Sequence, residues 1–356
     1  MLKKYPTIKF ISTRAGWYFI TLLVAVTLNF TLPRLGPNNP VDIIMGQFGS
    51  GLSAHEAQQR EERYLMEFGL IRMKGGEIVR DGEGRPIRTS LIEQYGSYVG
   101  MLAKGDLGTS FRSSEKVWDI ILRALPWTLA LQIPTIILGW FIGNLFGAYA
   151  AYRRGIFDKA LFPMALFLNS FPFFVFGMLL VYAFAILFRW FPPMGGYDLA
   201  LMPGFSFAFI LSAAHHYVLP FLSIFLIGVG GGAIGMRTMG IYELGTDYIK
   251  YAKWLGLKES KVLFYVFRNA MLPQITGLAL SLGTMVGGAL ITEMIFSYPG
   301  LGMAMLSAIQ NQDYAIIQGV TLIITVSVLI ANFSVDMFIA FFDPRVKAGI
   351  QMGKGG

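Results

Sequence analysis

Few side chains in this sequence are suited to catalytic or metal chemistry. The chain of 356 residues contains no cysteine and only three histidines, His55, His215 and His216. Without thiols it forms no disulfide, no zinc–thiolate site and no cysteine nucleophile. The histidines are too few and too scattered for a metal site, and a pair at the edge of an apolar run is more typical of a membrane interface. We therefore expect neither a catalytic residue nor a metal site.

Two glycine-containing sequence patterns are associated with nucleotide binding. Gly230–Gly235 fits the pattern G-x-G-x-x-G, but a dinucleotide site needs a strand before this motif, and here it lies inside an apolar run. The phosphate-binding pattern G-x-x-x-x-G-K-[ST] does not occur in the sequence. We expect no cofactor on this chain, so an ATP-driven machine containing it would hold ATP and Mg²⁺ on separate ATPase chains.

Two carboxylates lie within apolar runs, Glu293 and Asp336. A carboxylate inside a membrane is a candidate functional residue, because burying it without a partner is costly. Both also lie within about two helical turns of a predicted helix end. Their side chains would then either extend to the membrane–water interface or pair with a nearby arginine, and this explains their presence equally well.

Neutral polar residues also interrupt the apolar runs, namely Gln132, Asn144, Asn169 and Ser170. They would either line a polar path or form hydrogen bonds between helices. We take Gln132, Asn144, Asn169 and Glu293 as the candidate residues of a translocation path.

The elements that would position these residues are membrane helices. The sequence is 54% hydrophobic and 14% charged, with a mean hydropathy of +0.56, which is typical of polytopic membrane proteins. The net charge of +8 is not gathered on one basic face, so it does not indicate nucleic acid binding. We predict an all-α polytopic membrane protein embedded in the lipid bilayer with six transmembrane helices, at 17–32, 126–151, 160–188, about 217–236, 271–295 and 316–342.

The polar segments between these helices suggest a division into domains. We predict a cytoplasmic N-terminus and first helix at 1–34, a small extracytoplasmic domain at 35–122, a permease core at 123–342 and a tail at 343–356. Within segment 35–122, Ser53 and Glu56 fit the capping-box pattern and predict the start of a helix. This helix should end near Phe68, with Gly69 after its last residue. Residues 73–88, rich in glycine and charge, predict a loop or hairpin.

The distribution of basic residues predicts the topology. Segments 1–15, 152–159, 241–270 and the tail are rich in lysine and arginine, whereas the short loops on the other side hold only Arg189. By the positive-inside rule, both ends of the chain lie in the cytoplasm. Glycines spaced four apart predict close helix packing, at 139/143/147, 228/232, 231/235 and 283/287.

The longest polar interval in the C-terminal half runs from Asp247 to Pro273. Gly256 can adopt a left-handed backbone conformation at low cost, which would let one short helix stop and another begin at an angle. Tyr251, Trp254 and Leu257 would then form an apolar, aromatic knob of the kind that anchors protein interfaces.

The motifs of this interval resemble the coupling loop of ABC importer permeases of the peptide/nickel type. The resemblance rests on Ala252, Gly256–Leu257, Arg268–Ala270 and Leu272–Pro273. It extends over nearly the whole chain, through four further segments: Gly105–Ser110, 287–302 (GGALITEMIFSYPGLG), Gln312–Tyr314, where the family usually has arginine at the first position, and Asp343–Arg345. The residues expected to contact an ATPase are Asp247, Tyr248, Tyr251, Ala252, Lys253, Trp254, Gly256, Leu257, Arg268 and Asn269.

The resemblance implies a permease subunit in a prokaryotic plasma membrane. It implies a homologous second permease, which in this family usually forms a heterodimer with the first. It also implies two cytoplasmic ATPase subunits and an extracytoplasmic solute-binding protein. The implied cargo is an oligopeptide, with oligosaccharides or nickel as alternatives. Two other classes stay open at this point: an ion-coupled secondary transporter, which would require internal repeats and midplane charges, and a membrane protein whose outer domain is a receptor or assembly module.

Overall fold

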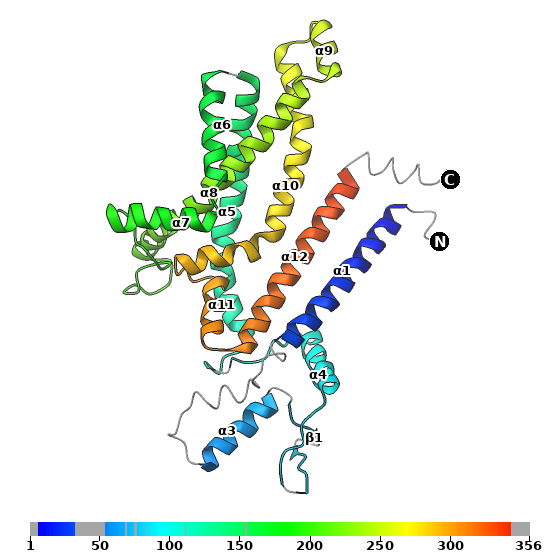
Figure 1. The fold of residues 1–356 in the computed structure, drawn as a ribbon, viewed down its shortest axis with the longest axis vertical. Coiled ribbons are helices and arrows are strands. Elements are labelled where there is room, and N and C mark those ends of the chain that lie inside the picture. Colours follow the sequence, from blue (N-terminus) through cyan, green and yellow to red (C-terminus); the bar gives the residue numbers. More distant parts are fainter. Residues whose placement is uncertain are drawn as a thin grey trace. The chain divides into compact units, whose positions relative to one another are not determined.

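The chain folds almost entirely into helices, some of them far longer than a bilayer requires. The computed structural model describes residues 6–32, 54–67, 70–74, 77–82, 84–110, 112–153 and 155–342. Its helices are α1 (Pro6–Thr31), α3 (Ala54–Glu67), α4 (Leu91–Ala103), α5 (Val117–Arg153), α6 (Ile156–Asn169), α7 (Phe173–Leu180), the π-helix η4 (Val181–Leu187), α8 (Phe207–Leu244), α9 (Asp247–Trp254), α10 (Glu259–Ile295), α11 (Leu301–Gln310) and α12 (Tyr314–Phe342) (Figure 1). Ser53, Phe68, Gly69 and the tail from Asp343 lie outside the described residues.

The chain divides into two compact units. The first contains residues 1–18, 123–303 and 326–356, and the second contains residues 19–122 and 304–325. The first unit thus holds α6 to α10 and most of α5, whereas the second holds α3, the hairpin and α4. Each unit is described by itself below.

Helix α8 is the centre of the first unit, where it contacts α6, α7 and α10. The predicted glycine packing is found between α5 and α8. A Cβ atom at Gly143 would lie 2.6 Å from the carbonyl oxygen of Val229, and one at Gly139 would lie 3.3 Å from that of Phe225. Because these positions lack side chains, the two helix backbones approach each other closely.

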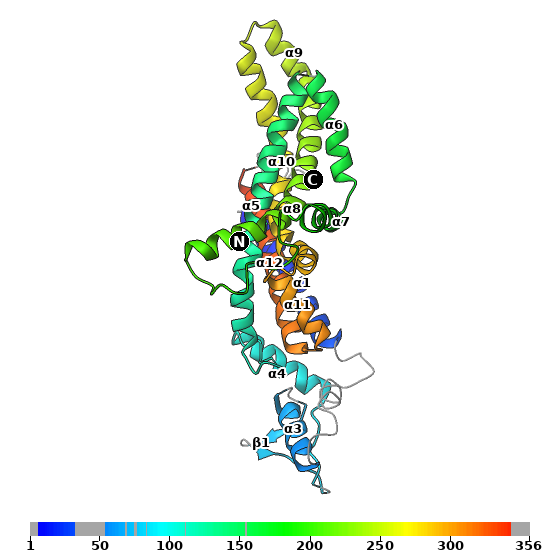
Figure 2. The same ribbon diagram turned by 90° about the vertical axis from the view of Figure 1, so that its left-hand side faces the viewer.

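The predicted third span, 160–188, is not one continuous helix, although its two parts can together form one span. Helix α6 ends at Asn169, and the chain bends by 98° before α7 and η4 continue. Pro172 is the N-cap of α7, and a proline disfavours helical geometry at the residue before it, here Phe171. Figure 2 shows α7 running across the direction of α6.

Length and composition identify four described helices that can cross a membrane, or up to five if the bent pair counts as one span. The four segments are Ile11–Thr31, Val117–Arg153, Phe207–Leu244 and Tyr314–Ser334. Helix α10, which covers the predicted fifth span, is not among the four segments found in the described residues. The chain is therefore a multi-pass membrane protein, and a sixth span stays a prediction.

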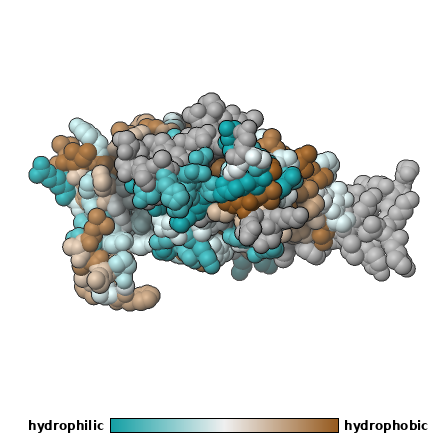
Figure 3. Space-filling view, turned by 90° about the horizontal axis from the view of Figure 1, so that it is seen from below, coloured by the Kyte–Doolittle hydropathy of each residue, from teal (hydrophilic) through white to brown (hydrophobic). Residues whose placement is uncertain are grey.

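The second unit contains the predicted hairpin. Strands β1 (Met73–Lys74) and β2 (Glu77–Ile78) pair antiparallel, and Leu65 of α3 packs with Ile71 in a small apolar cluster. Arg80 binds both carboxylate oxygens of Glu62, at 2.8 and 2.9 Å. This hydrogen-bonded guanidinium holds the pKa of the Glu62 carboxyl below its usual value. Figure 3 shows hydrophilic and hydrophobic residues beside each other on the described surface of the chain.

Two segments that are far apart in the sequence meet in the second unit. The Ser110 hydroxyl donates to the buried Asp313 carboxylate at 2.6 Å, and the backbone N–H of Ile316 donates to the same side chain at 3.3 Å. Asp313 therefore caps the start of α12 while it holds the turn that precedes α5. The contact joins the two sequence motifs Gly105–Ser110 and Gln312–Tyr314.

Candidate functional site

The segment that follows α8 is shaped by one left-handed glycine. Gly256 has φ +71°; its N–H donates to Lys253 O at 3.0 Å, and the Leu257 N–H donates to Ala252 O at 3.2 Å. These two bonds form a Schellman motif, which ends α9 and reverses the chain into α10. The predicted break at Gly256 is confirmed, but only the helix before it is short: α9 has 8 residues, whereas α10 continues for 37.

One face of α9 is fixed to α10 through a buried apolar cluster. Ile249 is 0% exposed and Ala252 is buried beside it, and both pack with Val262 and Val266 of α10. Leu257 packs against the same cluster, as residues at this position of a Schellman motif commonly do. Leu257 is therefore partly buried, and its contribution to the predicted apolar knob stays a prediction.

The opposite face of α9 presents apolar side chains to its surroundings. Trp254 is 81% exposed, Tyr251 61% and Leu255 63%. Figures 1 and 2 show α9 beyond the N-terminal end of α10, at one extremity of the first unit. Exposed aromatic residues on a rigid base, flanked by the exposed Lys253, are typical of a surface that binds another protein.

Polar contacts join α9 to its two neighbouring helices. The Tyr248 hydroxyl donates to the Glu243 carboxylate of α8 and accepts from the Asn269 amide of α10 at 2.7 Å. Burial and the bond to Glu243 raise the pKa of the Tyr248 phenol. At the start of α9, Lys250 pairs with Asp247 at 2.9 Å. These contacts fix the direction of α9 relative to α8 and α10.

Sequence reasoning missed two contacts near this end of the first unit. Asp158, in the first turn of α6, binds the Arg237 guanidinium of α8 through both carboxylate oxygens. Tyr152 of α5 donates to Glu259 at the start of α10. These residues were read only as part of the charge pattern, because an acidic residue in a basic loop does not reveal its partner on another helix.

The candidate path residues are not gathered in one place. Gln132 and Asn144 are both buried on α5, whereas Asn169 is exposed at the end of α6. The Asn144 amide donates to Trp140 O at 2.7 Å, and the Asn169 amide oxygen would lie 3.5 Å from a Cβ atom at Gly231. Their part in a translocation path stays a prediction.

Glu293 is fully buried, with an exposure of 0%. Its carboxylate accepts the Gly302 N–H at 2.6 Å and fills the space beside Gly300. The adjoining Leu301 N–H donates to the Thr128 hydroxyl at 2.9 Å. Glu293 thus holds the start of α11, where an acidic side chain also interacts favourably with the helix dipole.

Asp336 has partners of the kind expected for a carboxylate near a helix end. It lies 3.5 Å from the Arg14 guanidinium and accepts the Tyr18 hydroxyl at 2.9 Å. These contacts fix α12 to α1 within the first unit.

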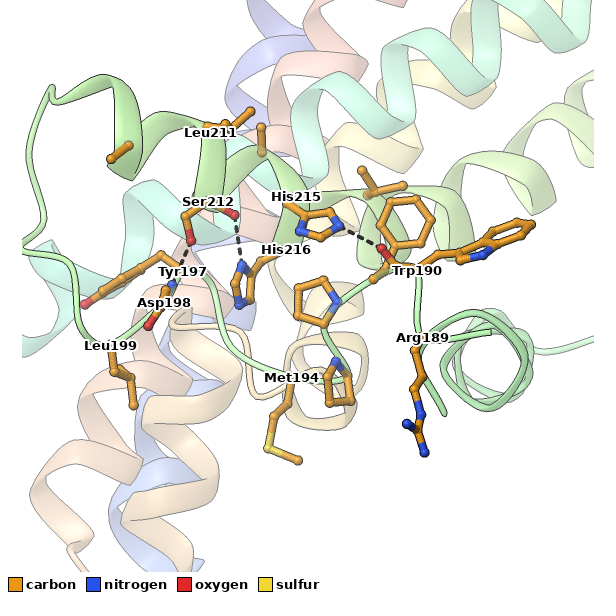
Figure 4. A pocket seen from close by; sticks show the side chains of 16 residues that line it. Arg189, Trp190, Met194, Tyr197, Asp198, Leu199, Leu211, Ser212, His215 and His216 are labelled. Carbon is orange, nitrogen blue, oxygen red and sulfur yellow. Dashed lines mark hydrogen bonds between the residues drawn. The ribbon is translucent and has the colours of Figure 1, made fainter. Parts of the chain in front are cut away.

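An open pocket of about 1230 Å³ lies between the loop after η4 and the start of α8. Figure 4 shows its two histidines directed at different backbone carbonyl groups. His215 donates to Trp190 O and His216 donates to Ser212 O, each at 2.8 Å. One ring nitrogen of each histidine is therefore hydrogen-bonded to a backbone carbonyl group. Among the described residues, the two rings do not form part of a metal-binding group.

Comparison with known proteins identifies the class of this fold. Residues 143–348 match the family described as the binding-protein-dependent transport system inner membrane component. The chain belongs to this family. It is therefore a transport permease subunit rather than an enzyme. Membership of this family argues against the two alternatives, an ion-coupled secondary transporter and a membrane receptor.

Similar proteins align along nearly their whole length. The chain is 31% identical over 355 residues to the di/tripeptide transport system permease protein DppB of Pseudomonas aeruginosa, covering 96% of this chain and 99% of that protein. It is 29% identical over 358 residues to the dipeptide transport system permease protein DppB of Escherichia coli, with the same coverage. The oligopeptide transport system permease protein AppB of Bacillus subtilis is 29% identical over 337 residues, covering 92% of this chain and 96% of that protein.

Proposed function

We propose that this chain is one of two permease subunits of an ATP-driven importer of short peptides. The exposed apolar face of α9 is the observation that supports coupling to an ATPase. Tyr251 and Trp254 of α9, and Leu255 directly after it, are exposed, while the opposite face of α9 is packed against α10. The peptide cargo is supported by the relatives, which are peptide transport permeases by name and align over at least 92% of this chain. Oligosaccharides and nickel are the alternative cargoes.

The proposed topology has six spans with both chain ends in the cytoplasm. Helix α10 would supply the fifth span despite its polar residues, since at 37 residues it is roughly 55 Å long, against a hydrocarbon core of about 30 Å. Lys250, Lys253, Lys258 and Lys261 would keep α9 and the start of α10 in the cytoplasm. Segment 35–122 would then lie outside the cell.

We propose that α9 binds in a cleft of a cytoplasmic ATPase subunit. ATP binding would close a pair of such subunits and move α9 as a rigid body together with the start of α10, because the Ile249–Val266 cluster joins them. The transmembrane helices would then open outward to accept cargo from a solute-binding protein, and hydrolysis would restore the inward-facing state. ATP and Mg²⁺ would be bound by the ATPase chains.

A purification in mild detergent from the native membrane tests this proposal. Mass spectrometry of the purified material should find a homologous second permease and one or two ATP-binding chains with a phosphate-binding loop. Peptide added before solubilisation should retain a solute-binding protein in the same material. Peptide uptake by the reconstituted complex should then require ATP. A chain that purifies only with itself, from membranes in which candidate partners are present, would contradict the proposal.

A further inference from the structure

Helix α4 of the second unit has an apolar side that is wider than its contact with the rest of the described chain. One side of the helix holds Leu91, Ile92, Tyr95, Tyr98, Val99 and Leu102. These residues lie together because positions three, four and seven apart share a face of an α-helix. Glu93 and Ser97 lie on the opposite side. The helix is therefore amphipathic.

Two tyrosines on the apolar side join α4 to the C-terminal end of α1 (Figure 1). The hydroxyl groups of Tyr95 and Thr27 are hydrogen-bonded at 2.8 Å, and the Asn29 amide donates to the Tyr98 hydroxyl at 3.1 Å. The Phe30 ring contacts both tyrosine rings, with its centroid 5.2 and 5.5 Å from theirs. These contacts cover one half of the apolar side.

The contacts with α1 place α4 at a surface of the membrane. Helix α1 contains the candidate span Ile11–Thr31. Thr27 lies about 6 Å before the end of this span, at 1.5 Å for each residue. Tyrosine is enriched at this depth, because its ring is apolar and its hydroxyl reaches water. Helix α4 therefore lies at the level where the span ends.

The other half of the apolar side is exposed. Ile92 is 84% exposed and Val99 36%, and Leu91 at the start of the helix is 64% exposed. A Cβ atom at Gly96, one turn after Ile92, would meet nothing within 4 Å. No described part of the chain therefore covers this half of the apolar side.

The polar side of α4 indicates how the helix is turned. Glu93 pairs with the exposed Arg72 at 2.7 Å, and Ser97 is exposed. These groups favour water, whereas the exposed Leu28 of the neighbouring α1 belongs to the membrane span. An amphipathic helix beside the end of a span fits the boundary between headgroups and acyl chains, where its apolar side is removed from water.

We propose that α4 is an interfacial helix that inserts Ile92 and Val99 into a phospholipid monolayer of the membrane. The helix thereby holds the β1–β2 hairpin at the membrane surface. Arg72, directly before β1, is bonded to Glu93, and the Thr89 N–H donates to Leu70 O at 2.9 Å. This inference concerns the second unit, and it depends neither on the cargo nor on coupling to an ATPase.

Spin labelling in phosphatidylcholine vesicles tests this placement in the full-length chain with its co-purifying partners. The sequence has no cysteine, so Ile92→Cys, Val99→Cys and Ser97→Cys each provide one labelling site. Molecular oxygen concentrates among acyl chains, whereas a neutral nickel chelate stays in water. The ratio of oxygen to chelate collision rates should be at least about threefold higher at positions 92 and 99 than at 97, because only the apolar side enters the bilayer.

Ser97→Cys is the matched control, because it places the same label on the exposed polar side of the same helix. Ile92 and Val99 are both exposed, so either variant tests the placement if the other does not fold. Equal ratios at all three positions would overturn the proposal, since α4 would then face water on every side. Protection of the labels at 92 and 99 from both reagents would overturn it as well, because another protein would then cover the apolar side.

Discussion

At the scale of the residue, Gly256 decides the shape of the proposed coupling segment. Its φ of +71° lies in a region that costs other residues roughly 1–2 kcal/mol, and β-branched residues suffer most. A Cβ atom there would meet nothing within 4 Å, so a substitution acts through the backbone alone.

Gly256→Val should separate ATP hydrolysis from peptide uptake. We expect normal insertion into the membrane but at least a tenfold loss of ATP-dependent uptake, because α9 would change its direction relative to α10. Gly256→Asn should retain more uptake, since asparagine tolerates the left-handed region. Gly100→Val is the control, because Gly100 lies in α4 with nothing within 4 Å of an added Cβ and without a positive φ. Wild-type uptake by Gly256→Val would contradict the role of the turn.

The sequence allowed the backbone conformation of some residues to be predicted, but not the contacts of others. The left-handed Gly256 could be predicted because glycine is the residue that adopts this conformation freely. The inward direction of Leu257 follows from the Schellman hydrogen bonds, which the sequence does not display. The acceptor left free on Asn144 depends on its bond to Trp140 O, and no sequence pattern reports which atom of an amide has a partner.

At the scale of the element, glycines on one face of α5 allow the close approach of α5 and α8. A Cβ at Gly143 would lie 2.6 Å from Val229 O and one at Gly139 would lie 3.3 Å from Phe225 O. The i, i+4 spacing predicted that these glycines face another helix. It did not identify α8 as that helix, because the spacing describes one surface and not its partner.

Alanine substitutions along these helices should show a graded effect on stability. Gly143→Ala should destabilise the folded chain by about 1–3 kcal/mol, because the helices must move apart, and Gly139→Ala should cost less. Gly277→Ala should be neutral or slightly stabilising, since nothing lies within 4 Å of its added Cβ and alanine favours the helix. Thermal unfolding in detergent measures all three. Equal effects at Gly143 and Gly277 would show that close packing is not the cause.

The bent third span shows why apolar length alone is a poor guide to helix continuity. The run from 160 to 188 is long enough to cross a bilayer, yet Pro172 divides it into helices that meet at 98°. Hydropathy registers proline only weakly, whereas its effect on the backbone is strong. Proline alone does not decide continuity either, because α10 is continuous over 37 residues with Pro273 inside it.

At the scale of the whole molecule, the class was predictable because several motifs agreed along the chain. Composition predicted a multi-pass membrane protein, and the motifs from Gly105 to Tyr314 predicted the permease family that residues 143–348 match. Contacts between distant motifs, such as Ser110 with Asp313, could not be predicted, because 203 residues separate them. Partners and cargo lie beyond the fold of one chain and rest on the proposed function.

The central claim is that α9 binds an ATPase subunit, and cross-linking measures this contact most directly. The sequence has no cysteine, so Trp254→Cys gives the chain a single thiol at a position that is 81% exposed. Leu199→Cys is the matched control, 91% exposed in the loop that precedes α8 and predicted to lie outside the cell. A thiol-to-amine cross-linker applied to the intact complex should join the Trp254→Cys chain to an ATP-binding subunit and leave the Leu199→Cys chain without that product. No such product from Trp254→Cys, or an equal yield from both variants, would contradict the account.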